Sequence, residues 1–121
     1  MANIIPFSFR GELFSGTHNF ANGGDSFKIA LYTGNPYSTS STAYLTGQEV
    51  SASNTGYTTG GKVLGSQAVA SGTAVASIDF ADSVLTSATF TAAFAAIYND
   101  SKSDKLCVVL DFGGNKTATN G

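Results

Sequence analysis

Two apolar segments separated by a short polar one constrain the fold of this chain most strongly. Residues 88–99 and 106–112 are rich in Phe, Ala, Val, Leu and Ile, whereas residues 100–105 between them are all polar or charged. Two apolar runs on either side of a polar turn are typical of a β-hairpin. Neither arm has a consistently polar face, so we expect the hairpin to lie in the middle of a sheet and to be covered on both sides.

The first arm of this hairpin is also compatible with a helix. Phe90, Phe94 and Ile97 have helical spacing, and alanine is the best helix former. We favour a strand because Thr-Phe-Thr at residues 89–91 and the β-rich second arm are typical of strands.

Size and composition indicate one β-rich domain covering residues 1–121. The chain has 121 residues, enough for a single core, and only 12% of them are charged, about half the usual share. Plentiful Phe and Tyr exclude a disordered chain. The fold class we predict is mainly β: an antiparallel β-sandwich or partly open barrel of about six to eight strands, with one short N-terminal helix.

The N-terminal segment, residues 1–16, contains the predicted helix. Pro6 suits the first helical position, Phe9 and Leu13 are four residues apart, and Gly16 is a plausible stop.

The remaining strands are predicted from alternation and turn residues. Residues 25–33 alternate cleanly, and residues 62–70 and 73–80 are compatible with a second hairpin around a two-residue Ser71-Gly72 turn. Residues 49–53 are a further candidate for a short strand.

The end of the sequence has the composition of a turn. Residues 113–121 contain two adjacent glycines, two asparagines and a final glycine, and no strand pattern follows them. Two interpretations remain open: a further strand belongs after Gly121, or the tail is an arm that pairs with a neighbouring molecule.

Charge, hydropathy and cysteine content restrict partners and location. The net charge is -2 and the six basic residues are scattered, which gives no reason to expect nucleic-acid binding. No apolar run approaches the roughly 20 residues of a membrane span, and we recognise no signal peptide. The one cysteine, Cys107, lies in an apolar segment and is expected to be a buried, inert thiol in a reducing cytoplasm.

No pattern indicates catalytic, cofactor-binding or metal-binding residues. His18 is the only histidine, and a lone histidine in a loop is usually ordinary surface. A Cys/His zinc site needs three or four ligands, and the chain contains two such residues. The acidic pairs Asp79 with Asp82 and Asp100 with Asp104 are better explained as strand-edge and turn residues than as an acid–base pair or a calcium loop.

Several segments, taken in order, resemble a family of small virion proteins of tailed bacteriophages. The segments are Glu-Leu-Phe-Ser-Gly-Thr-His-Asn-Phe at 12–20, Asp-Ser-Phe-Lys-Ile-Ala-Leu-Tyr-Thr at 25–33, Thr-Gly-Tyr-Thr-Thr-Gly-Gly at 55–61, Ile-Asp-Phe-Ala-Asp at 78–82, Ala-Ala-Ile-Tyr-Asn-Asp at 95–100 and Val-Leu-Asp-Phe-Gly at 109–113. In that family the last segment is followed by a turn and a further strand. The resemblance implies no catalytic residues.

The resemblance implies a non-enzymatic structural role in the virion, as a capsid decoration or cement protein assembled in the bacterial host cytoplasm. The implied partners are the major capsid protein and further copies of the chain itself, with neither nucleic acid nor a membrane involved. We expect the contacts to come from residues 4–14 and from the loops around two tyrosines; the residues are Ile4, Ile5, Phe7, Phe9, Tyr37 and Tyr57. The alternative for the N-terminal residues is a short helix that caps the open face of the sheet.

Two other functions remain as alternatives. One is a structural component of the tail or of the head–tail junction, which copy number would distinguish from a shell protein. The other is a glycan-binding β module on a head fibre or tail tip, in which loop tyrosines such as Tyr37 and Tyr57 stack on sugars.

Overall fold

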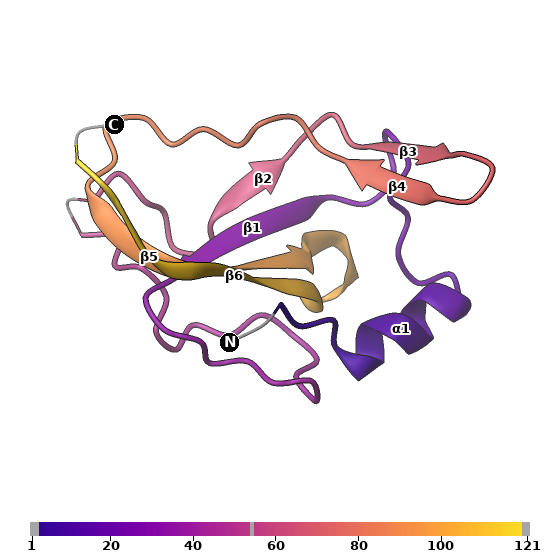
Figure 1. Ribbon diagram of the computed structural model, residues 1–121, viewed down its shortest axis with the longest axis horizontal. Helices are drawn as coiled ribbons and strands as arrows, with labels where there is room; N and C mark the ends of the chain where they lie inside the picture. Colours follow the sequence, from indigo (N-terminus) through magenta and orange to yellow (C-terminus); the bar gives the residue numbers. More distant parts are fainter. Residues whose placement is uncertain (1–2, 54, 120–121) are drawn as a thin grey trace.

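The structure is a computed structural model that describes residues 3–53 and 55–119. The described strands form a four-stranded antiparallel sheet in the order β2-β1-β5-β6 and a separate two-stranded sheet, β3-β4 (Figure 1). The predicted class, mainly antiparallel β with one short N-terminal helix, is confirmed, and the sheets do not close into a barrel. The elements are α1 (Phe7–Phe14), β1 (Phe27–Tyr32), β2 (Lys62–Leu64), β3 (Ala68–Ser71), β4 (Ala76–Asp79), β5 (Phe90–Asn99), the 3-10 helix η1 (Asp100–Lys102) and β6 (Lys105–Ala118).

The predicted central hairpin is present as β5 and β6. β5 lies between β1 and β6, and the polar connector forms η1. Residues on both faces of β5 are buried, including Ala95 and Ala96, which are both 0% exposed. The helical interpretation of this arm is therefore wrong. Its alanines are small, so the segments that cover the two faces of the sheet can pack closely against the strand.

The core lies on both sides of this sheet. On one face Tyr32, Ala96 and Tyr98 pack against Tyr37 and Tyr44 from the long loop that follows β1. On the other face Phe27 and Ile97 pack against Phe9, Phe20 and Phe80 from three other segments. Loops and a single helix, rather than a complete second sheet, therefore cover the sheet.

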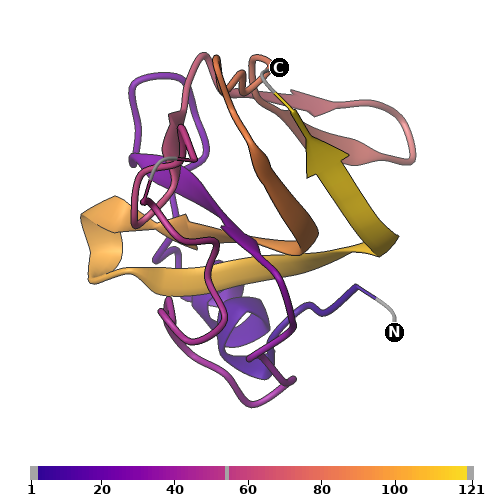
Figure 2. The same cartoon turned by 90° about the vertical axis from the view of Figure 1, so that its left-hand side faces the viewer.

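The segment after Phe112, predicted to be a turn, is the second half of β6. Its end pairs with the start of β5, with Phe90 opposite Ala118. The register shifts between Ala92 and Phe94, and in this region β6 turns a corner (Figure 2). Gly113 and Gly114 have φ angles of 77° and 149°, so they supply a bulge within the strand instead of a hairpin turn. Of the two interpretations of this tail, a further strand after Gly121 lies outside the described residues. The other, an arm that pairs with a neighbouring molecule, is wrong for the end of β6, which pairs with β5 of the same chain.

Helix α1 begins at Phe7, and Pro6 is its N-cap residue. The prediction that Pro6 is the first helical residue is therefore wrong by one position. The end of the helix agrees with the prediction for Gly16, which has a φ of 70°. Gly16 N donates to Leu13 O at 3.3 Å and Thr17 N donates to Glu12 O at 2.9 Å, the two hydrogen bonds of a Schellman motif. No helix residue is fully buried.

The second hairpin is confirmed with shorter arms. The segment 62–70 divides into β2, which pairs with β1, and β3, which pairs with β4. The β3–β4 turn comprises the four residues 72–75, and Gly72 N donates to Val75 O at 2.6 Å. The prediction of a two-residue turn at Ser71-Gly72 is therefore wrong. Residues 49–53 are not a strand; Glu49 makes only an isolated bridge with Tyr32.

Candidate functional site

The predicted contact residues of the N-terminal segment divide between the interior and the surface. Ile4 is buried, and it exchanges backbone hydrogen bonds of 2.9 Å with Val109, covering part of the β6 edge. Ile5 and Phe7 are exposed by 47% and 61%. Phe9 is half-buried and packs against His18, with 5.2 Å between the ring centroids. Ile5 and Phe7 are therefore available to a partner, whereas Ile4 and Phe9 hold the segment in place.

Helical periodicity explains why α1 presents aromatic side chains to solvent. Phe7 and Phe14 are seven residues apart and share one side of the helix, roughly opposite to Phe9. Phe14 is 93% exposed, and the guanidinium of Arg10 lies over the Phe7 ring, 5.6 Å from its centroid. We call Phe7, Arg10 and Phe14 the outer helix face. Aromatic residues and arginine are enriched in protein interfaces, which makes this face a candidate contact surface.

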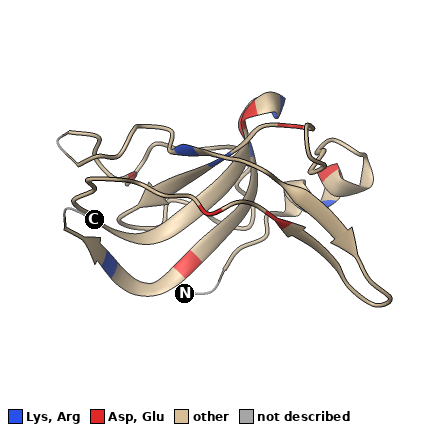
Figure 3. Ribbon diagram, turned by 90° about the horizontal axis from the view of Figure 1, so that it is seen from above, with Lys and Arg blue, Asp and Glu red and all other residues tan. Residues whose placement is uncertain are grey.

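The β3–β4 hairpin is a second exposed feature, which sequence reasoning did not identify as a contact surface. Every residue of both strands is exposed, and the hairpin projects from the body of the molecule (Figures 1 and 3). Val69, Val75 and Ile78 are exposed by 55%, 70% and 44%. An isolated two-stranded hairpin has marginal stability in water, so this one is suited to packing against a partner. The sequence contains a pattern that could have identified this hairpin. Residues 63–78 contain no charge, and Ala-Val-Ala-Ser occurs twice, at 68–71 and at 74–77.

An apolar groove lies between the inner side of α1, which carries Phe9, and the β3–β4 hairpin, and we call it the side groove. One part of about 300 Å³ lies between α1, β4 and the sheet, and is lined by Phe9, Phe20, Ile78, Phe80, Ile97 and Val108. Ile78 also lines the next part, about 460 Å³, whose other wall is the loop from His18 to Ala21. The groove lacks charged side chains among its lining residues, so it suits an apolar protein surface rather than a charged small molecule.

Tyr37 and Tyr57 are buried, which contradicts the expectation that they lie on a contact surface. Their exposed fractions are 4% and 3%. Tyr37 and Tyr32 are joined by a hydrogen bond of 2.5 Å between their hydroxyl oxygens, and Tyr32 donates to Leu45 O at 2.7 Å. Tyr57 belongs to the glycine-rich segment 55–61, which we call the glycine loop, and its hydroxyl accepts from Leu31 N at 3.1 Å. Loop polarity suggested exposure, but a tyrosine can bury its ring when its hydroxyl has a partner.

The carboxylate of Glu49 connects Tyr44 and Tyr57 to Gly60 of the glycine loop. Its Oε1 accepts from the Tyr44 hydroxyl and its Oε2 accepts from the Tyr57 hydroxyl, both at 2.5 Å. Gly60 N donates to the same Oε2 at 2.8 Å, and the Tyr98 hydroxyl donates to Gly60 O. Tyr44, Tyr57 and Tyr98 are therefore joined through Glu49 and Gly60, while Tyr32 and Tyr37 form a second hydrogen-bonded pair that packs against Tyr44 and Tyr98. We call the two groups together the tyrosine network.

This network predicts a loss of stability at alkaline pH. Burial raises the pKa of Tyr32, and burial with the nearby Glu49 carboxylate raises the pKa of Tyr44 and Tyr57. Burial also raises the pKa of Cys107 to about 12. These groups lose their protons more readily in the unfolded chain than in the folded one. The free energy of unfolding therefore keeps its full value at neutral pH and falls as the pH rises above about 9 to 10.

Urea unfolding midpoints measured across pH test this expectation. The midpoint should be constant near neutrality and should fall from about pH 9, where unfolded thiols begin to ionise. A Cys107→Ala variant should retain the part of the fall due to tyrosines, which begins near pH 10. A midpoint that stays level up to about pH 11 would contradict the network.

The side chain of His18 is buried, whereas the sequence had suggested a surface position. The side chain is 0% exposed, and Nε2 lies 2.9 Å from Glu12 Oε1. Asn99 Nδ2 donates to Nδ1 at 2.9 Å, and because Ser101 N donates to Asn99 Oδ1 the amide orientation is fixed. Nδ1 therefore carries no proton and Nε2 donates to Glu12. This arrangement joins α1 to the end of β5 and leaves the ring closed to a substrate.

Asp25 completes the same cluster. Partial burial alone would raise its pKa, but hydrogen bonds from Asn99 and from Asn19 N, with Lys102 nearby, hold the pKa below its ordinary value. Lys102 Nζ is 3.7 Å from Asp25 Oδ1. The cluster fixes the loop between α1 and β1. Within the described ranges, no group of three or more His, Cys, Asp or Glu residues is arranged to hold a metal ion.

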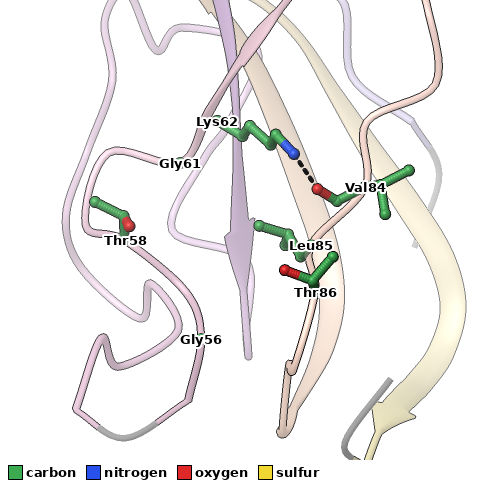
Figure 4. Close-up of a pocket in the computed structure, with 7 residues that line it drawn as sticks. All are labelled: Gly56, Thr58, Gly61, Lys62, Val84, Leu85 and Thr86. Carbon is green, nitrogen blue, oxygen red and sulfur yellow. Dashed lines mark hydrogen bonds between the residues drawn. The ribbon is translucent and has the colours of Figure 1, made fainter.

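A further slot lies beside β2 and is crossed by a lysine. Gly56, Thr58 and Gly61 form one wall, and residues 84–86 form the other, around about 240 Å³ (Figure 4). The Lys62 ammonium donates to Val84 O across this space (Figure 4). The donor is used within the chain, so we assign this slot no ligand.

Comparisons with protein-family models, with curated protein sequences and with solved structures give no match to this chain. Among the residues described, no helix is long and apolar enough to cross a membrane.

Proposed function

We propose that this chain is a non-enzymatic structural protein of a bacteriophage virion, a capsid decoration or cement protein that binds the outer shell in many copies. The sequence resemblance suggests the class of protein. The outer helix face is the observation that supports it: two exposed aromatic rings and an arginine share one side of a helix anchored by Phe9 on its other side.

The physical requirements of a cement protein match this arrangement. Such a protein binds the assembled shell and not its dissociated subunits, so each bound copy stabilises the shell by mass action. A rigid body that presents a few aromatic and arginine side chains can supply most of the binding energy from a small area. The partners in this proposal are the major capsid protein and neighbouring copies of the chain.

Replacing the two aromatic residues tests the proposal. A Phe7→Ser, Phe14→Ser variant should bind shells lacking the protein at least about tenfold more weakly than the unaltered chain, because exposed interface aromatics often contribute more than 1.4 kcal/mol. Co-sedimentation of purified protein with such shells measures the binding.

The matched control is Val84→Ser. Val84 is 57% exposed but lies in a different loop, so its replacement should leave shell binding unchanged. Circular dichroism and urea unfolding should show that all three proteins fold alike, since the replaced side chains are exposed. Equal binding by the double variant and the unaltered chain would exclude the outer helix face as the shell contact.

The glycan-binding alternative loses the observation that suggested it. The rings of Tyr37 and Tyr57 are buried against the sheet and hold the tyrosine network, so neither offers a face on which a sugar could stack. The tail or junction alternative uses the same kind of contact surface, and copy number distinguishes it from a shell role.

A further inference from the structure

Asn22 and Gly23 form the tip of an exposed turn between α1 and β1. Gly24 N donates to Ala21 O at 2.8 Å, which closes the turn, and Gly23 has a φ of 79°. Both tip residues are exposed, and a Cβ placed on Gly23 would meet no atom within 4 Å. Within the described part of the chain, the Asn22 amide makes no hydrogen bond. The main-chain nitrogen of Gly23 is thus next to an unconstrained amide, with no side chain of its own to shield it.

We propose that Asn22 is a site of spontaneous covalent modification, which converts it to isoaspartate through a cyclic imide. The main-chain nitrogen of Gly23 loses its proton to solvent base and attacks Cγ of Asn22. A new C–N bond forms, and the side-chain nitrogen leaves as ammonia. Water then adds to either carbonyl of the five-membered ring and opens it, giving aspartate or isoaspartate. Water is the only reagent consumed, and nothing is oxidised or reduced.

The structure distinguishes Asn22 from other asparagines that it describes. Asn99 is 0% exposed, and its Nδ2 donates to both His18 and Asp25 at 2.9 Å. Asn35 precedes Pro36, which has no N–H to lose. Asn115 lies within β6 and precedes Lys116, whose side chain shields the following nitrogen. Steric access and a free amide therefore coincide at Asn22.

Isoaspartate at this position would change the turn in two ways. It adds one carbon to the main chain inside the ring closed by the Ala21–Gly24 hydrogen bond, and it adds a carboxylate close to Asp25. Asp25 holds the loop through Asn19, whose N donates to Asp25 Oδ2 at 2.9 Å. Asn19 to Ala21 line one wall of the side groove, so the modification would alter that wall.

Peptide mapping of the folded full chain tests the proposal. The protein is incubated at mildly alkaline pH, sampled over time and digested with trypsin, which releases residues 11–28 as one peptide and residues 63–102, with Asn99, as another. The first peptide should gain the mass of an amide-to-carboxylate conversion and become a substrate for isoaspartyl methyltransferase. The peptide with Asn99 should remain unchanged. Asn120 precedes Gly121 and falls in a separate peptide, 117–121, so its reaction is measured apart.

Two variants make the result decisive. Asn22→Ser should abolish both signals in peptide 11–28. Asn22→Asp should add the charge at once and gain the methyltransferase signal more slowly, because Asp-Gly forms the same cyclic imide with loss of water instead of ammonia. A synthetic peptide of residues 11–28 gives the rate without the fold, and the folded chain should react at a comparable rate. If only the synthetic peptide reacts, the fold protects Asn22 and the proposal is wrong. If the Asn22→Ser variant still reacts, Asn19 is the site and the proposal is equally wrong.

Discussion

Replacing Phe27 with alanine should lower the free energy of unfolding by about 3–5 kcal/mol, the usual range for truncating a buried phenylalanine. Phe27 is 0% exposed and its ring stacks on Phe20, with 4.3 Å between centroids. Phe80 contacts the same ring at a centroid distance of 6.0 Å. The cavity would therefore open between the sheet and two covering segments that no second complete sheet supports. Urea unfolding followed by circular dichroism measures the loss.

Val63→Ala is the matched control for this variant. Val63 lies in the neighbouring strand β2 and is 54% exposed, so its truncation should change the free energy of unfolding by only about 0.5 kcal/mol. A loss below about 1 kcal/mol for Phe27→Ala would mean that the covering segments collapse into the space, and that they are less firmly placed than described.

Glu49→Ala should destabilise the chain by about 2–3 kcal/mol, because it removes the acceptor of charge-assisted hydrogen bonds and leaves buried groups without a partner. The Tyr57 hydroxyl and Gly60 N would lose Oε2, and the Tyr44 hydroxyl would lose Oε1. The affected residues belong to two loops that pack against different parts of the sheet, Tyr44 with Tyr98 and Tyr57 with Leu31. The expected result is a lower urea midpoint together with faster amide exchange at Gly60.

Glu49→Gln is the control that separates hydrogen bonding from charge. A glutamine retains one carbonyl oxygen as an acceptor, so it should lose roughly half as much stability as the alanine variant. The same exchange rate at Gly60 in the unaltered chain and in Glu49→Ala would show that the glutamate does not hold the glycine loop.

The sheet could be predicted where the sequence alternates, because alternation reflects burial directly. β1 was identified in this way, whereas the β5–β6 hairpin was identified from two apolar runs on either side of a polar turn. The second half of β6 could not be, because Gly113 and Gly114 give the same sequence signal in a bulge as in a turn. Both structures need positive φ angles, and only the pairing of Phe90 with Ala118 distinguishes them.

The exposure of the expected contact residues could be predicted only in part, because it depends on partners that are distant in sequence. Ile5 and Phe7 were expected to contact a partner and are exposed, but Tyr37 and Tyr57, which were expected on the surface because polar loops surround them, are buried. Partners such as Glu49 are distant in sequence and follow no period, so composition could not reveal that the rings are buried. Phe14 lies at the end of the expected contact segment, residues 4–14, and its seven-residue spacing to Phe7 puts both rings on one side of the helix.

The proposed shell role is tested most directly by a copy number. Under this proposal a phage encodes the protein, and purified virions of that phage contain it in a fixed ratio to the major capsid protein. Quantitative mass spectrometry against the major capsid protein should give a ratio of about one, or about one-third if a trimer occupies each site. A ratio below about one in thirty would contradict a decoration role and indicate the tail or the head–tail junction, where symmetry allows only a few copies. Absence from the particles would contradict the proposal as a whole.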